Sequence, residues 1–152
     1  SIEIYGVRPV IHHHAGGYID YMDEIDMILA DIPEKYVGLC FDTGHAYYAG
    51  IDPAQGLQKY CSRIEYIHFK DINKSVFDDV YHKNIGFYEA CHKRLMCPIG
   101  DGTLDYSSIK RSLIDIEYHG WITLEQDRHP NDTSNVPDCL LRSMTHLKEL
   151  GF

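Results

Sequence analysis

The stretch VGLCFDTGH, from Val37 to His45, decides the fold class that this sequence predicts. Its apolar residues form a nearly continuous run that ends at an acid, Asp42. A strand with one solvated face would alternate apolar and polar residues, so a continuous run indicates a strand covered on both faces. Strands of that kind belong to parallel sheets with helices packed against them. We therefore expect an α/β fold.

The segments around this stretch repeat one arrangement, in which a strand is followed by a helix. Patterns typical of strands occupy residues 8–13, 36–42, 63–71 and 120–127. Apolar residues at helical spacing predict helices over residues 21–30, 53–61, 76–92, 107–116 and 136–150, and a glycine-rich loop is expected over residues 96–105. Four such alternations are typical of βα units around a parallel sheet. We interpret residues 1–152 as a single domain.

Composition and charge exclude several classes of protein. The formal net charge is −9, which argues against a nucleic-acid partner or an anionic membrane surface, because both need a basic face. No apolar run approaches the length of a membrane span, so no membrane association is expected. The five cysteines are scattered and form no CxxC pair, which favours free thiols in a reducing compartment. We expect a cytoplasmic protein.

Each predicted strand ends in side chains that are able to bind a metal. The strand ends read HHH at residues 12–14, FDTGH at 41–45, HFKD at 68–71 and LEQDR at 124–128. Active sites of α/β sheets and barrels are built at this edge, so four such endings together are the strongest functional signal in the sequence. Side chains alternate along a strand, so His12 and His14 share one side and His13 takes the other.

Asp42, His68 and Glu125, with His12 from the first strand, form the predicted metal site. Two carboxylates and one or two imidazoles suit a single divalent ion such as Mn, Co, Zn, Fe or Mg rather than a soft thiolate metal. Each residue also has an ordinary structural interpretation. Asp42 could cap the next helix, His68 could be a core histidine, and Glu125 could form a structural salt bridge, because burying it unpaired is costly.

Four polar residues are expected to contact a substrate beside this ion. His45 follows Asp42 by three residues and could bind a hydroxyl, while Lys70 shares a strand face with His68. Arg128 could bind an anionic or polyhydroxylated ligand, and His14 faces the same side as His12. For Lys70 and Arg128 the alternative is a solvated charge at a strand end.

A divalent ion beside a carboxylate suggests a definite reaction. The ion polarises a carbonyl or an α-hydroxyl and stabilises the enediolate that forms when the adjacent proton leaves. Glu125 is the expected base, with His45 as the second catalytic group. Return of the proton gives isomerisation or epimerisation, whereas loss of a β-hydroxyl gives dehydration. The expected substrate is a small polyhydroxylated carbonyl compound, either a sugar or a cyclitol.

Five motifs carry a resemblance to a known family. VIHHHAGG, VGLCFDTGH, IEYIHFKD, CPIGDGTLDY and GWITLEQD resemble, in order and spacing, the C-terminal half of the xylose-isomerase-like sugar phosphate isomerase/epimerase barrels. The inosose dehydratase branch is the most similar in the triple histidine, the HFKD strand and the GDG loop. The resemblance implies a (β/α)8 TIM barrel with one divalent ion at the carboxyl ends of its strands. By position, Asp42, His68 and Glu125 match the metal ligands, His45 matches a substrate-contacting histidine, and Arg128 lies near a substrate-binding arginine.

The sequence departs from the family pattern in two ways. Many of these isomerases place a glutamate where this chain has His12, which puts two-base epimerisation in doubt and leaves dehydration or one-base isomerisation less affected. We expect His12 to coordinate, with water or His14 as alternatives. A (β/α)8 barrel also takes about 250 residues, and four strands alone would leave two sheet edges exposed. We therefore expect a fragment of a longer protein, or one half of a dimeric or split barrel.

Two other classes of function compete with a sugar enzyme. Endonuclease IV resembles the same barrel, but a DNA-repair function would need further zinc ligands and a basic groove, against which the net charge of −9 argues. A non-catalytic sugar-binding barrel is the second alternative, because the first glutamate is replaced and half of the barrel is missing.

Overall fold

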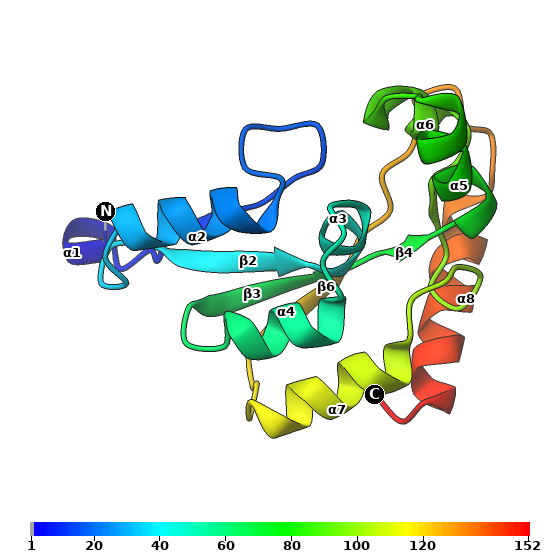
Figure 1. Cartoon of the computed structure of the whole chain (residues 1–152). Helices are drawn as coiled ribbons and strands as arrows, with labels where there is room; N and C mark the ends of the chain where they lie inside the picture. Colours follow the sequence, from blue (N-terminus) through cyan, green and yellow to red (C-terminus); the bar gives the residue numbers. More distant parts are fainter. Residues whose placement is uncertain (1) are drawn as a thin grey trace.

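The computed structural model describes residues 2–152 and contains a parallel sheet of four strands (Figure 1). The strands are β1 (Val10–His12), β2 (Gly38–Asp42), β3 (Ile64–Phe69) and β6 (Trp121–Leu124), and they lie in this order across the sheet. Every neighbouring pair is parallel, so all four carboxyl ends meet at one edge. The predicted α/β arrangement is confirmed.

The helices are short and connect the strands. They are α1 (Ile2–Tyr5), α2 (Met22–Asp31), α3 (Thr43–Tyr48), α4 (Pro53–Lys59), α5 (Lys74–Lys83), α6 (Phe87–His92), α7 (Tyr106–Asp115) and α8 (Val136–Glu149). The main core joins the outward side chains of β2 and β3, such as Phe41 and Ile67, to apolar side chains of α2, α4, α7 and α8. In Figure 1, α5 and α6 lie beyond the arrowheads of the strands. None of the helices described has the length and apolar character needed to cross a membrane.

The structure corrects the helix predicted over residues 76–92. Two helices, α5 and α6, occupy this segment, because Asn84 adopts a left-handed conformation with φ 52° and ends α5. Asparagine tolerates this conformation better than most residues, so it ends a helix in the way that glycine does. The expected loop over residues 96–105 also begins with a short strand, β5 (Met96–Cys97), which pairs antiparallel with β4 (Asp71–Ile72).

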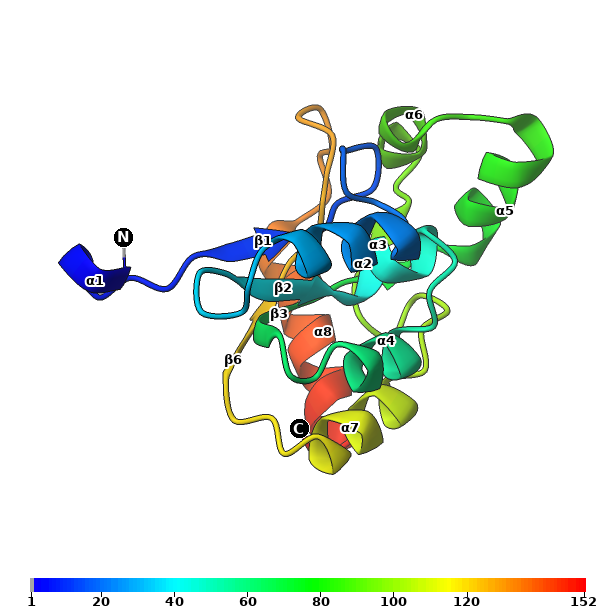
Figure 2. The ribbon, with the colours of Figure 1, turned by 60° about the vertical axis from the view of Figure 1, so that its left-hand side comes forward.

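The two outer strands of the sheet each have one unpaired edge within residues 2–152. The strand order places β1 at one side and β6 at the other, and each pairs with a single neighbour. Figure 2 shows β1 at the near side of the sheet, with the chain leading into it from α1. The sheet is therefore an open segment of a barrel rather than a closed one, as expected for four βα units.

Candidate metal centre

Asp42 links the central strand to the candidate site. It is the last residue of β2 and the N-cap of α3, and its side chain is fully buried. Its Oδ1 accepts hydrogen bonds from the backbone N–H groups of Gly44 and His45, each at 2.9 Å. Gly44 is required here, because a Cβ atom would lie 2.6 Å from the Cβ of Lys70. These bonds orient the carboxylate so that Oδ2 faces the end of the barrel.

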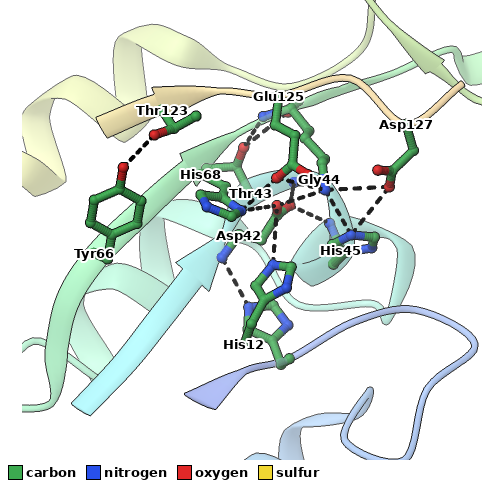
Figure 3. Close-up of polar contacts among 12 residues, drawn as sticks. His12, Asp42, Thr43, Gly44, His45, Tyr66, His68, Thr123, Glu125 and Asp127 are labelled. Atoms are coloured by element: carbon green, nitrogen blue, oxygen red, sulfur yellow. Dashed lines mark hydrogen bonds and ion pairs between the residues drawn. The ribbon is translucent and has the colours of Figure 1, made fainter. Parts of the chain in front are cut away.

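Three predicted ligands converge on Asp42 Oδ2 from three other strand ends (Figure 3). His12 Nε2 lies 3.5 Å from this oxygen and His68 Nδ1 lies 3.6 Å from it, while His68 Nδ1 lies 2.6 Å from Glu125 Oε2. The strand register explains the convergence, because Asp42 pairs with His68 in the sheet and the backbone N–H of Glu125 bonds to the carbonyl of Phe69. The ligand atoms of Asp42, His68 and Glu125 all lie within 4.8 Å of one another.

The donor atoms of this cluster fit a divalent cation. The buried atoms His12 Nε2, Asp42 Oδ2, His68 Nδ1 and Glu125 Oε2 contact one another and Lys70 across the site. Carboxylate oxygens and imidazole nitrogens at this spacing form a ligand set that suits a divalent ion. The charges agree as well. Three carboxylates outnumber the one lysine at this edge of the sheet, and the excess of negative charge favours the binding of a cation.

The carboxylates also shift the pKa values of their neighbours. Contact with Asp42, then Cys40 and Glu125, raises the pKa of His68 to about 11. Burial alone would raise the pKa of Asp42, but its contacts with His12 and His68 hold that pKa well below the usual range. Contact with His68 lowers the pKa of Glu125. Both carboxylates are therefore ionised at neutral pH, as metal ligands must be.

Lys70 is a buried cation in the middle of the site. Its Nζ lies 3.1 Å from Asp42 Oδ2, 3.3 Å from Glu125 Oε2, 3.3 Å from Asp127 Oδ2 and 2.9 Å from His45 Nε2. Burial would lower its pKa, but the three carboxylates outweigh this effect and raise it. The sequence placed Lys70 in this space by strand alternation, and the structure excludes the alternative of a solvated charge.

His45 and Asp127 form the second half of the site. His45 is fully buried, and its Nδ1 accepts a hydrogen bond from the backbone N–H of Ala15 at 3.3 Å. Its Nε2 lies 2.9 Å from Lys70 Nζ and 3.3 Å from Asp127 Oδ2. Burial lowers the pKa of His45, which keeps the ring neutral. Asp127 was not predicted as a site residue.

The two remaining histidines of the triple motif lie on opposite sides of β1, as alternation predicts. The ring of His14 stacks on that of His45 with 3.8 Å between centroids, and its Nδ1 donates to the carbonyl of Ala15 at 2.8 Å. His13 points the other way and packs on Phe41. Its Nε2 accepts the backbone N–H of Asp42 at 3.0 Å, so it supports the site without facing it.

Arg128 is the one predicted substrate-binding residue that lies apart from the cluster. Its Nη2 donates to the carbonyl of Ser134 at 3.1 Å and lies 3.5 Å from Asp132. These contacts hold the side chain against the loop that follows β6. A role in substrate binding remains a prediction.

Asp71 organises the GDG loop beside the site. Its buried carboxylate accepts the backbone N–H groups of Gly100, Gly102 and Leu104 at 3.0, 3.2 and 3.1 Å. Asp71 comes directly after the HFK segment. The sequence alone gave no reason to connect it with the GDG loop, which lies about thirty residues further along the chain. The GDG glycines therefore serve to fold the loop around Asp71.

This arrangement is typical of the α/β barrels with a metal site at one end. In that class, parallel βα units bring carboxylates and histidines to the carboxyl ends of the strands. A family model described as xylose isomerase-like TIM barrel matches residues 2–150. The chain belongs to this family.

Curated relatives of the chain are named inosose dehydratases. The protein of that name from Geobacillus kaustophilus is 36% identical over 125 residues, which cover 82% of this chain and 41% of the relative. One from Clostridium botulinum strain Alaska E43 is 31% identical over 144 residues, which cover 95% of this chain and 48% of the relative. The chain thus spans less than half the length of these relatives.

Solved structures share the fold at low sequence identity. A probable 3-DHS dehydratase, AsbF, from Bacillus anthracis superimposes with a TM-score of 0.70 at 22% identity, over 94% of this chain and 50% of that one. The IOLI protein, solved with a zinc atom bound, also gives a TM-score of 0.70, at 15% identity, over 98% of this chain and 50% of that one. These likenesses extend over the whole described sheet.

Proposed function

We propose that this chain provides the metal centre of a divalent-metal-dependent lyase that removes water from a keto-inositol, as the inosose dehydratases do. The observation that carries the proposal is the convergence of the ligand atoms of Asp42, His68 and Glu125, all within 4.8 Å of one another, at the carboxyl ends of the strands. The names of the relatives supply the substrate class. The zinc atom of the IOLI structure, which shares this fold, supports a divalent ion as the cofactor.

Asp42, His68, Glu125 and His12 would hold the ion. When bound, a divalent cation supplies Lewis-acid polarisation of a substrate carbonyl and its neighbouring hydroxyl. Glu125 Oε2 then takes the proton from the carbon next to the carbonyl, and the electron pair of that C–H bond forms the enediolate.

Lys70 and His45 complete the reaction. Lys70 is a charged ammonium group, and it donates a proton to the β-hydroxyl, so that the C–O bond breaks and water leaves. Glu125 has then gained a proton that Lys70 has lost, and it returns this proton to the neutral amine, because its Oε2 lies 3.3 Å from Lys70 Nζ. His45, whose Nε2 lies 2.9 Å from Lys70 Nζ, binds the leaving hydroxyl and orients the ammonium group. Water is the only product besides the unsaturated ketone.

The test compares the reaction of the intact protein with inosose and with ketosugars in the presence of Mn²⁺ or Co²⁺. We expect an enone absorbance with inosose, and a loss of turnover of about 10²–10⁴-fold in Glu125→Gln, the range for removal of a general base. Glu89→Gln is the matched control, because Glu89 is an exposed residue of α6 whose ion pair is with Lys93. If metal content and turnover both survive Glu125→Gln, the assigned site is wrong.

An isomerase or epimerase is the second candidate. His12 stands where these enzymes carry a glutamate, and this favours dehydration over two-base epimerisation. Formation of an isomeric ketose without an enone in the same assay would support the isomerase and contradict the dehydratase.

A further inference from the structure

Cys40 lies in the interior of the barrel directly beneath the proposed metal centre. Its strand neighbours Leu39 and Phe41 point outward into the helical core, so Cys40 and Asp42 share the opposite, inner side of β2. Cys40 pairs with His12 across the sheet, and its side chain is only 2% exposed. It forms no disulfide.

The thiol and two imidazoles form a ligand group of their own. The ligand atoms of His12, Cys40 and His68 all lie within 4.8 Å of one another. None of the other cysteines in the described part of the chain belongs to a group of this kind.

The two ligand groups differ in chemical preference. Asp42, His68 and Glu125 offer two oxygens and a nitrogen, which suit hard and borderline ions such as Mn²⁺ and Mg²⁺. Cys40 with His12 and His68 offers one sulfur and two nitrogens, which suit thiophilic ions such as Zn²⁺ and Cd²⁺. The groups share His68, so one ion can occupy either set but two ions cannot occupy both fully.

We propose that Cys40 provides a second coordination mode at this centre, in which His12, Cys40 and His68 bind a thiophilic divalent cation. In this mode the S–H bond breaks, the sulfur binds the cation as a thiolate, and the proton leaves to solvent, with no change of oxidation state. The inference extends the proposed function, since it shares His12 and His68 with the proposed centre.

The experiment titrates the intact protein with Cd²⁺ and separately with Mn²⁺, in a phosphine reductant that contains no thiol. Cd²⁺ binding should produce a thiolate-to-metal charge-transfer absorbance in the ultraviolet. We expect this absorbance to disappear in Cys40→Ser, with at least a tenfold loss of Cd²⁺ affinity, and to persist in Cys61→Ser. Cys61 is the matched control because it is exposed and lies outside the ligand groups.

Mn²⁺ binding, followed by the electron paramagnetic resonance signal of the free ion, tests the proposed centre independently. Cys40→Ser should leave Mn²⁺ affinity within about twofold, whereas Glu125→Gln should weaken it and leave the Cd²⁺ absorbance in place. Cd²⁺ binding without the absorbance, or an absorbance that survives in Cys40→Ser, overturns the role of Cys40. Failure of the wild-type protein to bind Mn²⁺ overturns the oxygen-rich centre instead. If circular dichroism shows that Cys40→Ser is unfolded, Cys40→Ala replaces it. Loss of the Cd²⁺ absorbance in Cys40→Ala then supports the role of Cys40, and its survival overturns that role.

Discussion

At the scale of single residues, His13 shows how a buried neutral imidazole supports the site from behind. Its Nε2 accepts the backbone N–H of Asp42, which leaves the proton on Nδ1. Burial lowers the pKa of His13 to about 3, from an ordinary value of 6.5. The native protein therefore keeps this ring neutral at a pH where the unfolded chain is already protonated.

This difference predicts a loss of stability in acid. The unfolded state binds more protons than the native state between pH 6.5 and pH 3, so the free energy of unfolding falls as the pH drops through that window. From pH 7 to pH 4.5, His13 should account for a loss of about 2–3 kcal/mol. Urea denaturation of the wild type and His13→Gln measures it, because the glutamine oxygen can still accept the Asp42 N–H but does not titrate. If the free energy of unfolding falls equally in the wild type and in His13→Gln, His13 is not the source of the loss in acid.

Individual site residues were predictable where they belong to a strand. Alternation along β1 and β3 brought His12 and Lys70 to the cluster, as expected. Asp42 Oδ1 caps α3, so the capping interpretation is confirmed, while its role as a metal ligand stays a prediction. Asp127 was missed because β6 ends at Leu124, so its direction depends on the fold of the loop rather than on strand periodicity.

At the scale of elements, the loop around Asp71 is built by one buried carboxylate. Four backbone N–H groups, from Ile72, Gly100, Gly102 and Leu104, donate to its two oxygens. Each such bond satisfies a polar group that would otherwise be costly to bury. The loop conformation therefore depends on close approach of the backbone to Asp71.

Gly102→Ala should break this arrangement. A Cβ atom at this position would lie 2.1 Å from Asp71 Oδ1 and 2.7 Å from the carbonyl oxygen of Ile72, neither of which has room to move. We expect the free energy of unfolding to fall by at least about 2 kcal/mol, from overpacking together with lost hydrogen bonds. Gly86→Ala is the control, because a Cβ there meets nothing within 4 Å, and it should change stability by less than about 1 kcal/mol. Urea denaturation gives both values, and similar losses would contradict this account of the loop.

Apolar patterning predicted the main helices and strands. It did not predict the break between α5 and α6 or the short strand β5. Residues 76–92 carry helical spacing, but the left-handed Asn84 ends α5 and the extended Gly86 is the N-cap of α6. This division is local, and asparagine and glycine at these positions are its signal in the sequence. By contrast, β5 consists of two residues that form a strand because β4 lies beside them, and a local pattern does not contain that contact.

At the scale of the whole molecule, the sheet is about half of a barrel. The chain covers 41% and 48% of two relatives, and its sheet ends at β1 and β6 with unpaired edges among the described residues. Large apolar side chains also remain exposed, among them Trp121 of β6 at 79%, Leu141 of α8 at 66% and Ile114 of α7 at 64%. Exposed edges and apolar surfaces of this kind favour association with another chain or segment.

The 152-residue segment, produced alone, should therefore self-associate through these edges. We expect an apparent mass of at least twice the monomer in size-exclusion chromatography with light scattering. Trp121→Lys should raise the dissociation constant at least about tenfold, since it places a charge where a large aromatic side chain would be buried. Tyr18→Lys is the control, because Tyr18 is a fully exposed aromatic residue in the loop between β1 and α2. A stable monomer would show that four βα units bury enough apolar surface to stand alone. Equal weakening by the two lysines would place the contact elsewhere than at the β6 edge.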